Sequence, residues 1–286
     1  FPVDMDDLVN AFDATQLNSP SFKNNPMIKE FLDFDGSTVR PMSSIVANVL
    51  LSKIFKAGVV TDVMINIFKQ LNNLRSQKAV RQILRKMMIF SNLQQLLNKD
   101  DKDYKYNLIR FYEALKPLDG CADNPYFWLQ YAILKLSEYD YQAAEVYFSN
   151  AYSYAKKLPN FDTYQIDNHH CRFLLENEIE NGSQASCMKA FCSAHNILID
   201  PRHREDAYYY PYRVAQKYYP FYEMFYAGMN DSEKKIFVSS CEAMLERTEW
   251  YLKRNSSTGE KREAVRAKDL LTKIIKEIES MEANSK

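Results

Sequence analysis

The sequence predicts an all-α protein built from successive helices, and three observations lead to this fold class. Apolar residues recur at three- and four-residue spacing over most of the chain after Pro41. Only 6 of the 286 residues are glycine, which disfavours a fold made of many tight β-hairpins. Hydrophobic residues make up 46% and charged residues 26%, which are ordinary globular values that argue against disorder.

Composition also narrows the function classes. Lys+Arg and Asp+Glu both number 37, so no overall positive field predicts non-specific nucleic-acid binding. The 5 cysteines form no CxxC pair, which suits thiols in a reducing compartment. We identify no signal peptide and no apolar run near the ~20 residues that span a bilayer. The sequence starts at Phe1 rather than Met, and we therefore expect a cytoplasmic fragment of a longer protein.

The first predicted domain, residues 1–100, combines a linker with a small helical module. The segment Ile28–Val39 indicates a short helix followed by a strand or turn at Asp35-Gly36. This is the one place where we expect β structure.

Helix boundaries after this segment are predicted from glycine and capping residues. Gly58 is predicted to end the helix that follows Pro41. Thr61 or Asp62 is predicted to cap the next helix. A third helix is predicted over Gln77–Leu97.

Residues 69–88 carry six basic side chains and no acidic one. The usual interpretation of such a run is a solvated helix face. The alternative is a nucleic-acid-binding face, whose affinity would fall steeply with salt. The six residues are Lys69, Arg75, Lys78, Arg81, Arg85 and Lys86.

Residues 101–255 are predicted to form an irregular tetratricopeptide-like α-solenoid. Asn124-Pro125 begins a helix, and a tight turn separates it from the next helix. A Trp, a small residue four positions later, and Ala-x3-Phe-x2-Ala after the turn match the tetratricopeptide signature. The small residues let helix axes approach, and the aromatic residues fill the space between pairs. These repeat-packing residues are Trp128, Ala132, Ala144, Phe148 and Ala151.

Further helices are predicted in pairs along the same array, followed by a charged amphipathic helix in the last predicted domain, residues 256–286. The predicted pairs are Phe161–Ile179 with Gln184–Ile199, and Glu205–Tyr226 with Ser232–Lys253.

No pattern in the sequence indicates catalysis. Gly-rich phosphate loops, zinc spacings and nucleophile elbows do not occur, so we expect no enzyme, no cofactor and no metal site. His170 and Cys171 are neighbours, but adjacent residues on a helix do not face each other.

Aromatic residues are unusually dense over residues 208–226. Five tyrosines fall at three- or four-residue spacing on one helical face, with kinks expected at Pro211 and Pro220. Core packing and partner binding both fit this pattern, because tyrosine offers a large contact area with a polar end. Base stacking is a minor alternative. The candidate partner-binding residues are Tyr208, Tyr212, Arg213, Tyr219, Tyr222 and Tyr226.

Two segments, Asn124–Ile133 (NPYFWLQYAI) and Phe161–His170 (FDTYQIDNHH), resemble the C-terminal helical region of bacterial STAND-type P-loop NTPases of antiphage defence, the AVAST group and its relatives. The segment Phe34–Ala47 resembles the winged-helix-like part that follows their ATPase core. The resemblance implies a parent protein with an effector, an ATPase and a sensor, although no nucleotide-binding or effector motif occurs in this chain.

On this basis we expect a protein-binding sensor or scaffold domain that recognises a phage protein. The expected partners are that protein, the rest of a larger parent chain, and a homo-oligomer formed through the parent. Nucleic acid and membrane are not expected partners. The competing functions are a nucleic-acid-binding module and a purely structural oligomerisation domain.

Overall fold

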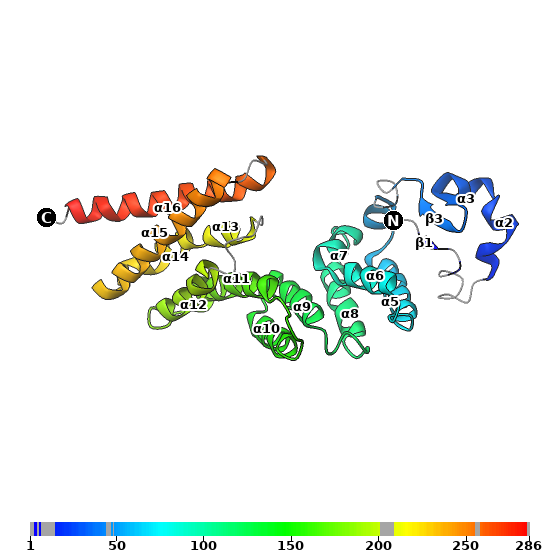
Figure 1. The fold of residues 1–286 in the computed structure, drawn as a ribbon, viewed down its shortest axis with the longest axis horizontal. Coiled ribbons are helices and arrows are strands. Elements are labelled where there is room, and N and C mark those ends of the chain that lie inside the picture. The colour runs from blue at the N-terminus through cyan, green and yellow to red at the C-terminus, as the bar shows by residue number, and fades with distance from the viewer. Residues whose placement is uncertain are drawn as a thin grey trace. The chain divides into compact units, whose positions relative to one another are not determined.

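A computed structural model describes most of the chain, and helices dominate it (Figure 1). The chain forms two compact units, Phe1–Glu138 and Tyr139–Lys286. The predicted all-α fold class is confirmed, since most of the described residues are helical. The division after Glu138 falls inside the segment 101–255, and the domain limits at 100 and 255 stay predictions. The described residues are 3–4, 6, 15–43, 47, 49–200, 209–254 and 258–284.

The N-terminal unit begins with a small antiparallel sheet in the order β1-β3-β2. Strands β2 and β3 form a hairpin, and Gly36 in its turn has a φ of 59°, a conformation that glycine adopts without strain. The expected β structure at Asp35-Gly36 is confirmed, whereas β1 was not expected. The elements are β1 (Val3–Asp4), η1 (Thr15–Asn18), α2 (Pro20–Lys23), α3 (Pro26–Phe31), β2 (Leu32–Asp35) and β3 (Thr38–Pro41).

Longer helices follow in the same unit. Their bounds are η2 (Leu50–Ile54), α5 (Ala57–Asn72), α6 (Lys78–Met88), α7 (Phe90–Leu96), α8 (Tyr104–Leu115) and α9 (Pro125–Ser137).

Helix α5 begins earlier than expected. It starts at Ala57, so Gly58 lies in its first turn and does not end a helix. Neither Thr61 nor Asp62 caps it. Instead the backbone N–H of Ala57 donates to Oδ2 of Asp101, 2.9 Å away. The predicted cap was wrong because the carboxylate of Asp101, far away in the sequence, accepts the hydrogen bond of the first N–H of the helix.

The single helix predicted over Gln77–Leu97 is divided in two at Ile89. Such a break frees the carbonyl of Met88 and the N–H of Phe90, which must find other partners when they are buried. The hydroxyl of Tyr112 on α8 donates to the Met88 carbonyl at 2.6 Å. The Phe90 N–H donates to Oε1 of Gln130 on α9 at 3.0 Å. Tertiary contacts therefore stabilise the break.

Helices α5 and α8 lie side by side and run in the same direction. Ala57 pairs with Asp101, and further along both segments Arg110 pairs with Asp62. Phe68 and Phe111 meet edge to face between the two helices, with ring centroids 6.5 Å apart. Helices α6 and α7 connect α5 to α8, so the unit consists of successive helical layers.

The C-terminal unit consists of helices, and those of its described part are bounded as follows: α10 (Tyr141–Ala155), α11 (Tyr164–Asn181), α12 (Cys187–Ile199), α13 (Tyr210–Ala215), α14 (Tyr218–Phe225), η4 (Tyr226–Gly228), α15 (Asp231–Arg254) and α16 (Thr258–Asn284).

Helices α13 and α14 follow the same direction as α11. His169 contacts Tyr210 near the start, where the His169 Nδ1 and Tyr210 hydroxyl lie 2.8 Å apart. Seven residues later on both segments, Nζ of Lys217 lies 2.8 Å from Oε1 of Glu176. These two contacts, in the same order along both segments, show that the helices are parallel.

Two other contacts place α15 parallel to α12. The rings of Phe191 and Phe237 lie 4.8 Å apart, and Arg247 donates to the carbonyl of Leu198 further along both helices. Helix α16 then packs against α13, α14 and α15. In the C-terminal unit, α13 and α14 therefore pack on α11, and α16 packs on α13 and α14. In the sequence, α12 lies between α11 and α13, and α15 lies between α14 and α16.

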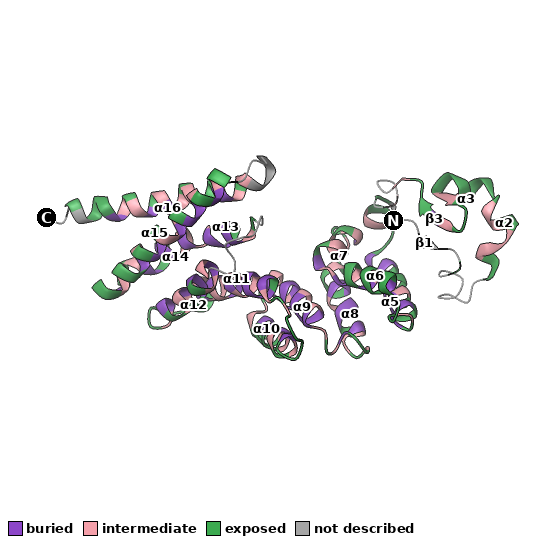
Figure 2. Ribbon diagram, viewed as in Figure 1, coloured by how far each residue is buried: buried purple, intermediate pink, exposed green. Residues whose placement is uncertain are grey.

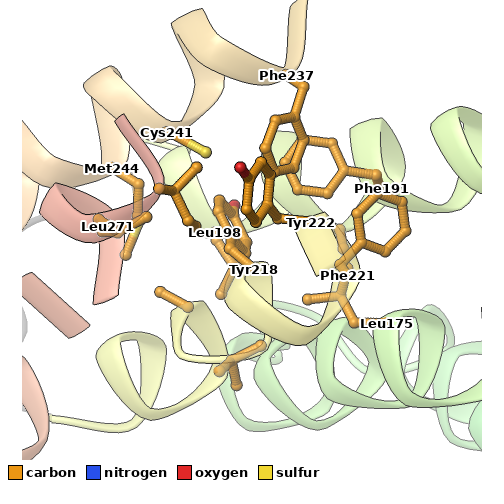
Figure 3. Packing of buried hydrophobic residues seen from close by; sticks show 14 of the residues in the cluster. Leu175, Phe191, Leu198, Tyr218, Phe221, Tyr222, Phe237, Cys241, Met244 and Leu271 are labelled. Atoms are coloured by element: carbon orange, nitrogen blue, oxygen red, sulfur yellow. The ribbon is translucent and has the colours of Figure 1, made fainter. Parts of the chain in front are cut away.

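A large aromatic core holds these layers together (Figure 3). Phe191 on α12 contacts several rings of this core, with the centroids of Tyr218 and Phe221 at 4.8 Å and 5.0 Å from its own. Figure 2 shows mostly buried residues on α13 and mostly exposed or half-buried residues on α16. Helix α16 still contributes buried residues at helical spacing, among them Leu271 and Ile274, to this core.

The residues predicted to mediate repeat packing, Trp128, Ala132, Ala144, Phe148 and Ala151, are all buried. On α10, Ala144, Phe148 and Ala151 share one face, and Phe148 contacts Phe173 of α11 with ring centroids 5.6 Å apart. That face of α10 therefore packs on α11.

Enlarging Ala151 tests the close packing of α10 on α11. We expect Ala151→Leu to lower the free energy of unfolding by about 1–3 kcal/mol, because the buried site has no room for three more carbon atoms. Val146→Leu, on the exposed side of α10, is the control and should change stability by less than about 0.5 kcal/mol. Chemical denaturation measures both, and equal effects would contradict close packing at Ala151.

Candidate functional site

The structure separates the candidate tyrosines into different environments. Tyr212 and Tyr222 are only 3% and 5% exposed. The Tyr212 ring packs on Tyr251 at 4.4 Å, and Tyr222 stacks on Phe237 at 6.3 Å. These two are core residues, which corrects their assignment to a binding surface. Tyr226 is half-buried, and Tyr208 lies outside the described residues.

The helix predicted over Glu205–Tyr226 is also corrected, since α13 and α14 are separate helices in its described part. Pro211 and Pro220 lie in the first turns of these helices and do not kink one long helix. Proline suits a first turn because the N–H it lacks has no intrahelical partner there. Aromatic residues occur on several sides of α14 because α11, α16 and the core all pack against it.

Arg213 and Tyr219 share a cavity of about 560 Å³ between α11, α13, α14 and α16, which we call the α11–α16 cavity. Arg213 is exposed and Tyr219 is half-buried. Charged side chains of both signs dominate its lining. The basic members are Arg172, Arg213, Lys217 and Arg266, and the acidic members are Glu176, Glu223 and Glu263.

Several lining groups are held in place by one another. Oε1 of Glu176 accepts from Nε of Arg172 at 3.0 Å and from Nζ of Lys217 at 2.8 Å. Lys273 lies over the Tyr219 ring, with its Nζ 4.3 Å from the ring centroid. Within the described part of the chain, Arg213 and Arg266 form no ion pair.

A neutral pair, His169 and Tyr210, lies beside these cations. Burial, together with Arg172 and Arg213, lowers the pKa of His169 to about 3. Burial raises the pKa of the Tyr210 hydroxyl. Of this pair, Tyr210 lines the cavity, so the wall places a neutral hydroxyl beside the basic and acidic side chains. Its arginines are the groups suited to a carboxylate ligand.

The structure offers no support for Cys171 as a nucleophile. Its Sγ lies 3.4 Å from the carbonyl oxygen of Ala194, and burial raises the pKa of its thiol well above the usual range. His170 instead packs its ring on Phe148 and Phe173. Among the described residues, no group of His, Cys, Asp and Glu is arranged to hold a metal ion, and no helix is long and apolar enough to cross a membrane.

A different cavity lies in the N-terminal unit, and we call it the basic groove. Its volume is about 960 Å³. Four of the six basic residues singled out in the sequence line it: Arg75, Lys78, Arg81 and Arg85. Lys69 and Lys86 are exposed but do not line it. Tyr126 of α9 also lines the groove, and nothing in the sequence indicated that it lies beside Arg85.

Comparison of this chain with known protein families, with curated proteins and with solved structures found no match.

Proposed function

We propose that this chain is a protein-binding sensor or scaffold built as an irregular tetratricopeptide-like α-solenoid, with no catalytic activity of its own. Parallel stacking supports this proposal: α11 is followed by α13 with α14 and then by α16, while α15 runs parallel to α12. Arrays of this kind bind ligands on extended faces formed by successive helices.

The α11–α16 cavity is the proposed binding site, and its position between successive parallel helices is the observation that carries the proposal. Arg213 and Arg266 supply cationic donors for a carboxylate of the partner. Tyr219 adds a half-buried ring with a polar end, a residue type enriched at protein interfaces.

The sequence resemblance supplies the proposed biological setting. We propose that the chain is the sensor region of a cytoplasmic antiphage defence ATPase of the STAND class, and that its ligand is a phage protein. The small sheet and helices before residue 100 would then correspond to the winged-helix-like module. The effector and the ATPase would belong to other parts of the parent protein, through which it would oligomerise.

Affinity capture from phage-infected and uninfected bacterial lysates, followed by mass spectrometry, tests this proposal. We expect one phage protein to be enriched by the wild-type chain. Arg213→Glu combined with Tyr219→Ala should reduce its capture about tenfold, which corresponds to about 1.4 kcal/mol of binding free energy.

The matched control combines Lys189→Glu with Tyr154→Ala. Lys189 is exposed on α12, and Tyr154 is half-buried beneath Lys157, as Tyr219 is beneath Lys273. This control should retain capture. Enrichment of nucleic acid, or of the chain alone, would refute the sensor proposal, and undiminished capture by the cavity variant would refute the site.

A further inference from the structure

The basic groove has an apolar floor and a cationic rim. Phe68, Leu84 and Met88 line its floor and are nearly inaccessible to solvent. Lys78, Arg81 and Arg85 lie at positions i, i+3 and i+7 of α6, so they follow one face of that helix over about 10 Å. All three are exposed. Because the three apolar side chains are almost completely covered, a ligand in the groove would contact mainly the exposed basic side chains and the half-buried Tyr126.

The charge of this region is locally one-sided, although the whole chain is neutral. No Asp or Glu occurs in residues 63–99, which include α6 and α7. An acidic residue nearby, Asp119, lies 3.5 Å from Nη2 of Arg75, and its side chain is 85% exposed. An exposed pair of this kind is weak. The groove therefore keeps a positive field, to which the N-terminal end of α6 adds.

The rim is pre-organised by contacts within the unit. Nη1 of Arg81 donates to the carbonyls of Arg75 and Ser76 at 3.2 Å and 2.6 Å, which fixes the turn before α6. The Arg85 guanidinium lies 4.1 Å from the centroid of the Tyr126 ring. Little side-chain entropy remains for a ligand to remove at these positions, which favours binding.

The turn before α9, beside the groove, contains a glycine at position 120. Gly120 has a φ of 75°, a conformation that other residues rarely adopt. A Cβ there would lie 3.4 Å from Cδ of Arg75, which is ordinary van der Waals contact with a side chain that lines the groove. The backbone conformation, and not crowding by Arg75, therefore favours glycine in the turn before α9.

We propose that the basic groove binds an acidic peptide segment of a partner protein. An apolar side chain of that segment would pack on the accessible part of the Tyr126 ring and on the aliphatic stems of the basic residues, and its carboxylates would pair with Lys78 and Arg85. A peptide fits better than a single-stranded nucleic acid, because successive bases need a row of aromatic rings on which to stack. Of the two aromatic residues that line the groove, Phe68 is buried, and Arg85 covers one face of the Tyr126 ring. This site lies in the other unit from the α11–α16 cavity and does not depend on the function proposed for it.

Fluorescence anisotropy with a labelled synthetic peptide tests the proposal. The probe carries a central Phe flanked by Glu residues, and the comparison probes replace Glu with Lys or Phe with Gly. We expect the Glu/Phe peptide to bind with an affinity that falls as salt rises, and either replacement to weaken it. Lys78→Glu combined with Arg85→Glu should lower its affinity about tenfold or more.

Lys69→Glu combined with Lys86→Glu is the matched control, because it makes the same charge change in the same acid-free segment outside the groove. It should change affinity less than about twofold. A thermal melt of each variant establishes that it folds, and Arg213→Glu with Tyr219→Ala should leave peptide binding intact. The proposal is overturned if the peptide does not bind, if both charge-reversal pairs weaken it equally, or if a labelled oligothymidylate binds more tightly at the same residues.

Discussion

Replacing Phe191 with alanine is expected to lower the free energy of unfolding of the C-terminal unit by about 3–5 kcal/mol. Phe191 is completely buried, and its ring contacts Tyr218, Phe221 and Phe237 within 5.0 Å between ring centroids. These residues come from α14 and α15, while Phe191 itself belongs to α12. The substitution therefore leaves a cavity where three helices meet, and the surrounding rings are too rigid to fill it.

Chemical denaturation followed by circular dichroism measures this effect. Met224→Ala is the control, because Met224 is 57% exposed on α14, and its loss should cost less than about 0.5 kcal/mol. Equal destabilisation by the two variants would mean that the aromatic core does not govern the stability of this unit.

Acidification is expected to destabilise the same unit through its buried histidines. Burial lowers the pKa of His195 from 6.5 to about 4, and its Nδ1 lies 2.8 Å from the hydroxyl of Tyr218. The unfolded chain therefore binds a proton at His195 at a higher pH than the folded chain does. Stability is fully present above pH 6.5 and is lost as the pH falls from there towards 4, by about 3 kcal/mol for His195 alone. His169, with its pKa lowered to about 3, adds in the same direction.

Denaturation curves measured from pH 7 to pH 4 test this linkage. His195→Gln removes the titrating ring and keeps a hydrogen-bonding partner for Tyr218, so its stability should depend less steeply on pH. A variant with the same pH dependence as the wild type would exclude His195 as a source of the acid sensitivity.

Local chemistry in the sequence was sufficient to predict several helix starts. Asn124-Pro125 was predicted to begin a helix, and α9 begins at Pro125, where Oδ1 of Asn124 accepts from the N–H of Tyr126 at 2.9 Å. Helical spacing also predicted the final helix, which extends over Thr258–Asn284. A helix cap and a helical period each depend on residues only a few positions apart, so a single sequence is enough to predict them.

Features that depend on distant residues were not predictable in this way. The break at Ile89 contains neither glycine nor proline, and Tyr112 and Gln130 of later helices stabilise it. Periodicity placed Tyr212 and Tyr222 on one face of a helix. It does not tell what packs against that face, and here the aromatic core covers it.

The candidate sites show the same limit. Arg213 and Tyr219 were predicted from local aromatic density, but the cavity they share also needs Glu263 and Arg266 from α16. The basic residues of α6 were visible in the sequence, whereas the contact of Tyr126 with Arg85 was not. Each site is formed by helices that are far apart in the sequence and meet only after folding. A local sequence pattern therefore identified the residues of one helix in each site but not those of its neighbours.

Helix α16 packs against α13, α14 and α15, and most of its described residues are exposed or half-buried. A helix with few buried residues opens more easily than the core on which it packs, so its amide hydrogens should exchange with solvent before those of the aromatic core. Glu263, Arg266 and Leu270 of α16 also form part of the cavity wall. A ligand of the cavity would bind only while α16 is packed in place, so it would stabilise that form and slow the exchange of the α16 amides by mass action. Protection of the α16 amides would thus report occupancy of the cavity before the chemical identity of the ligand is known.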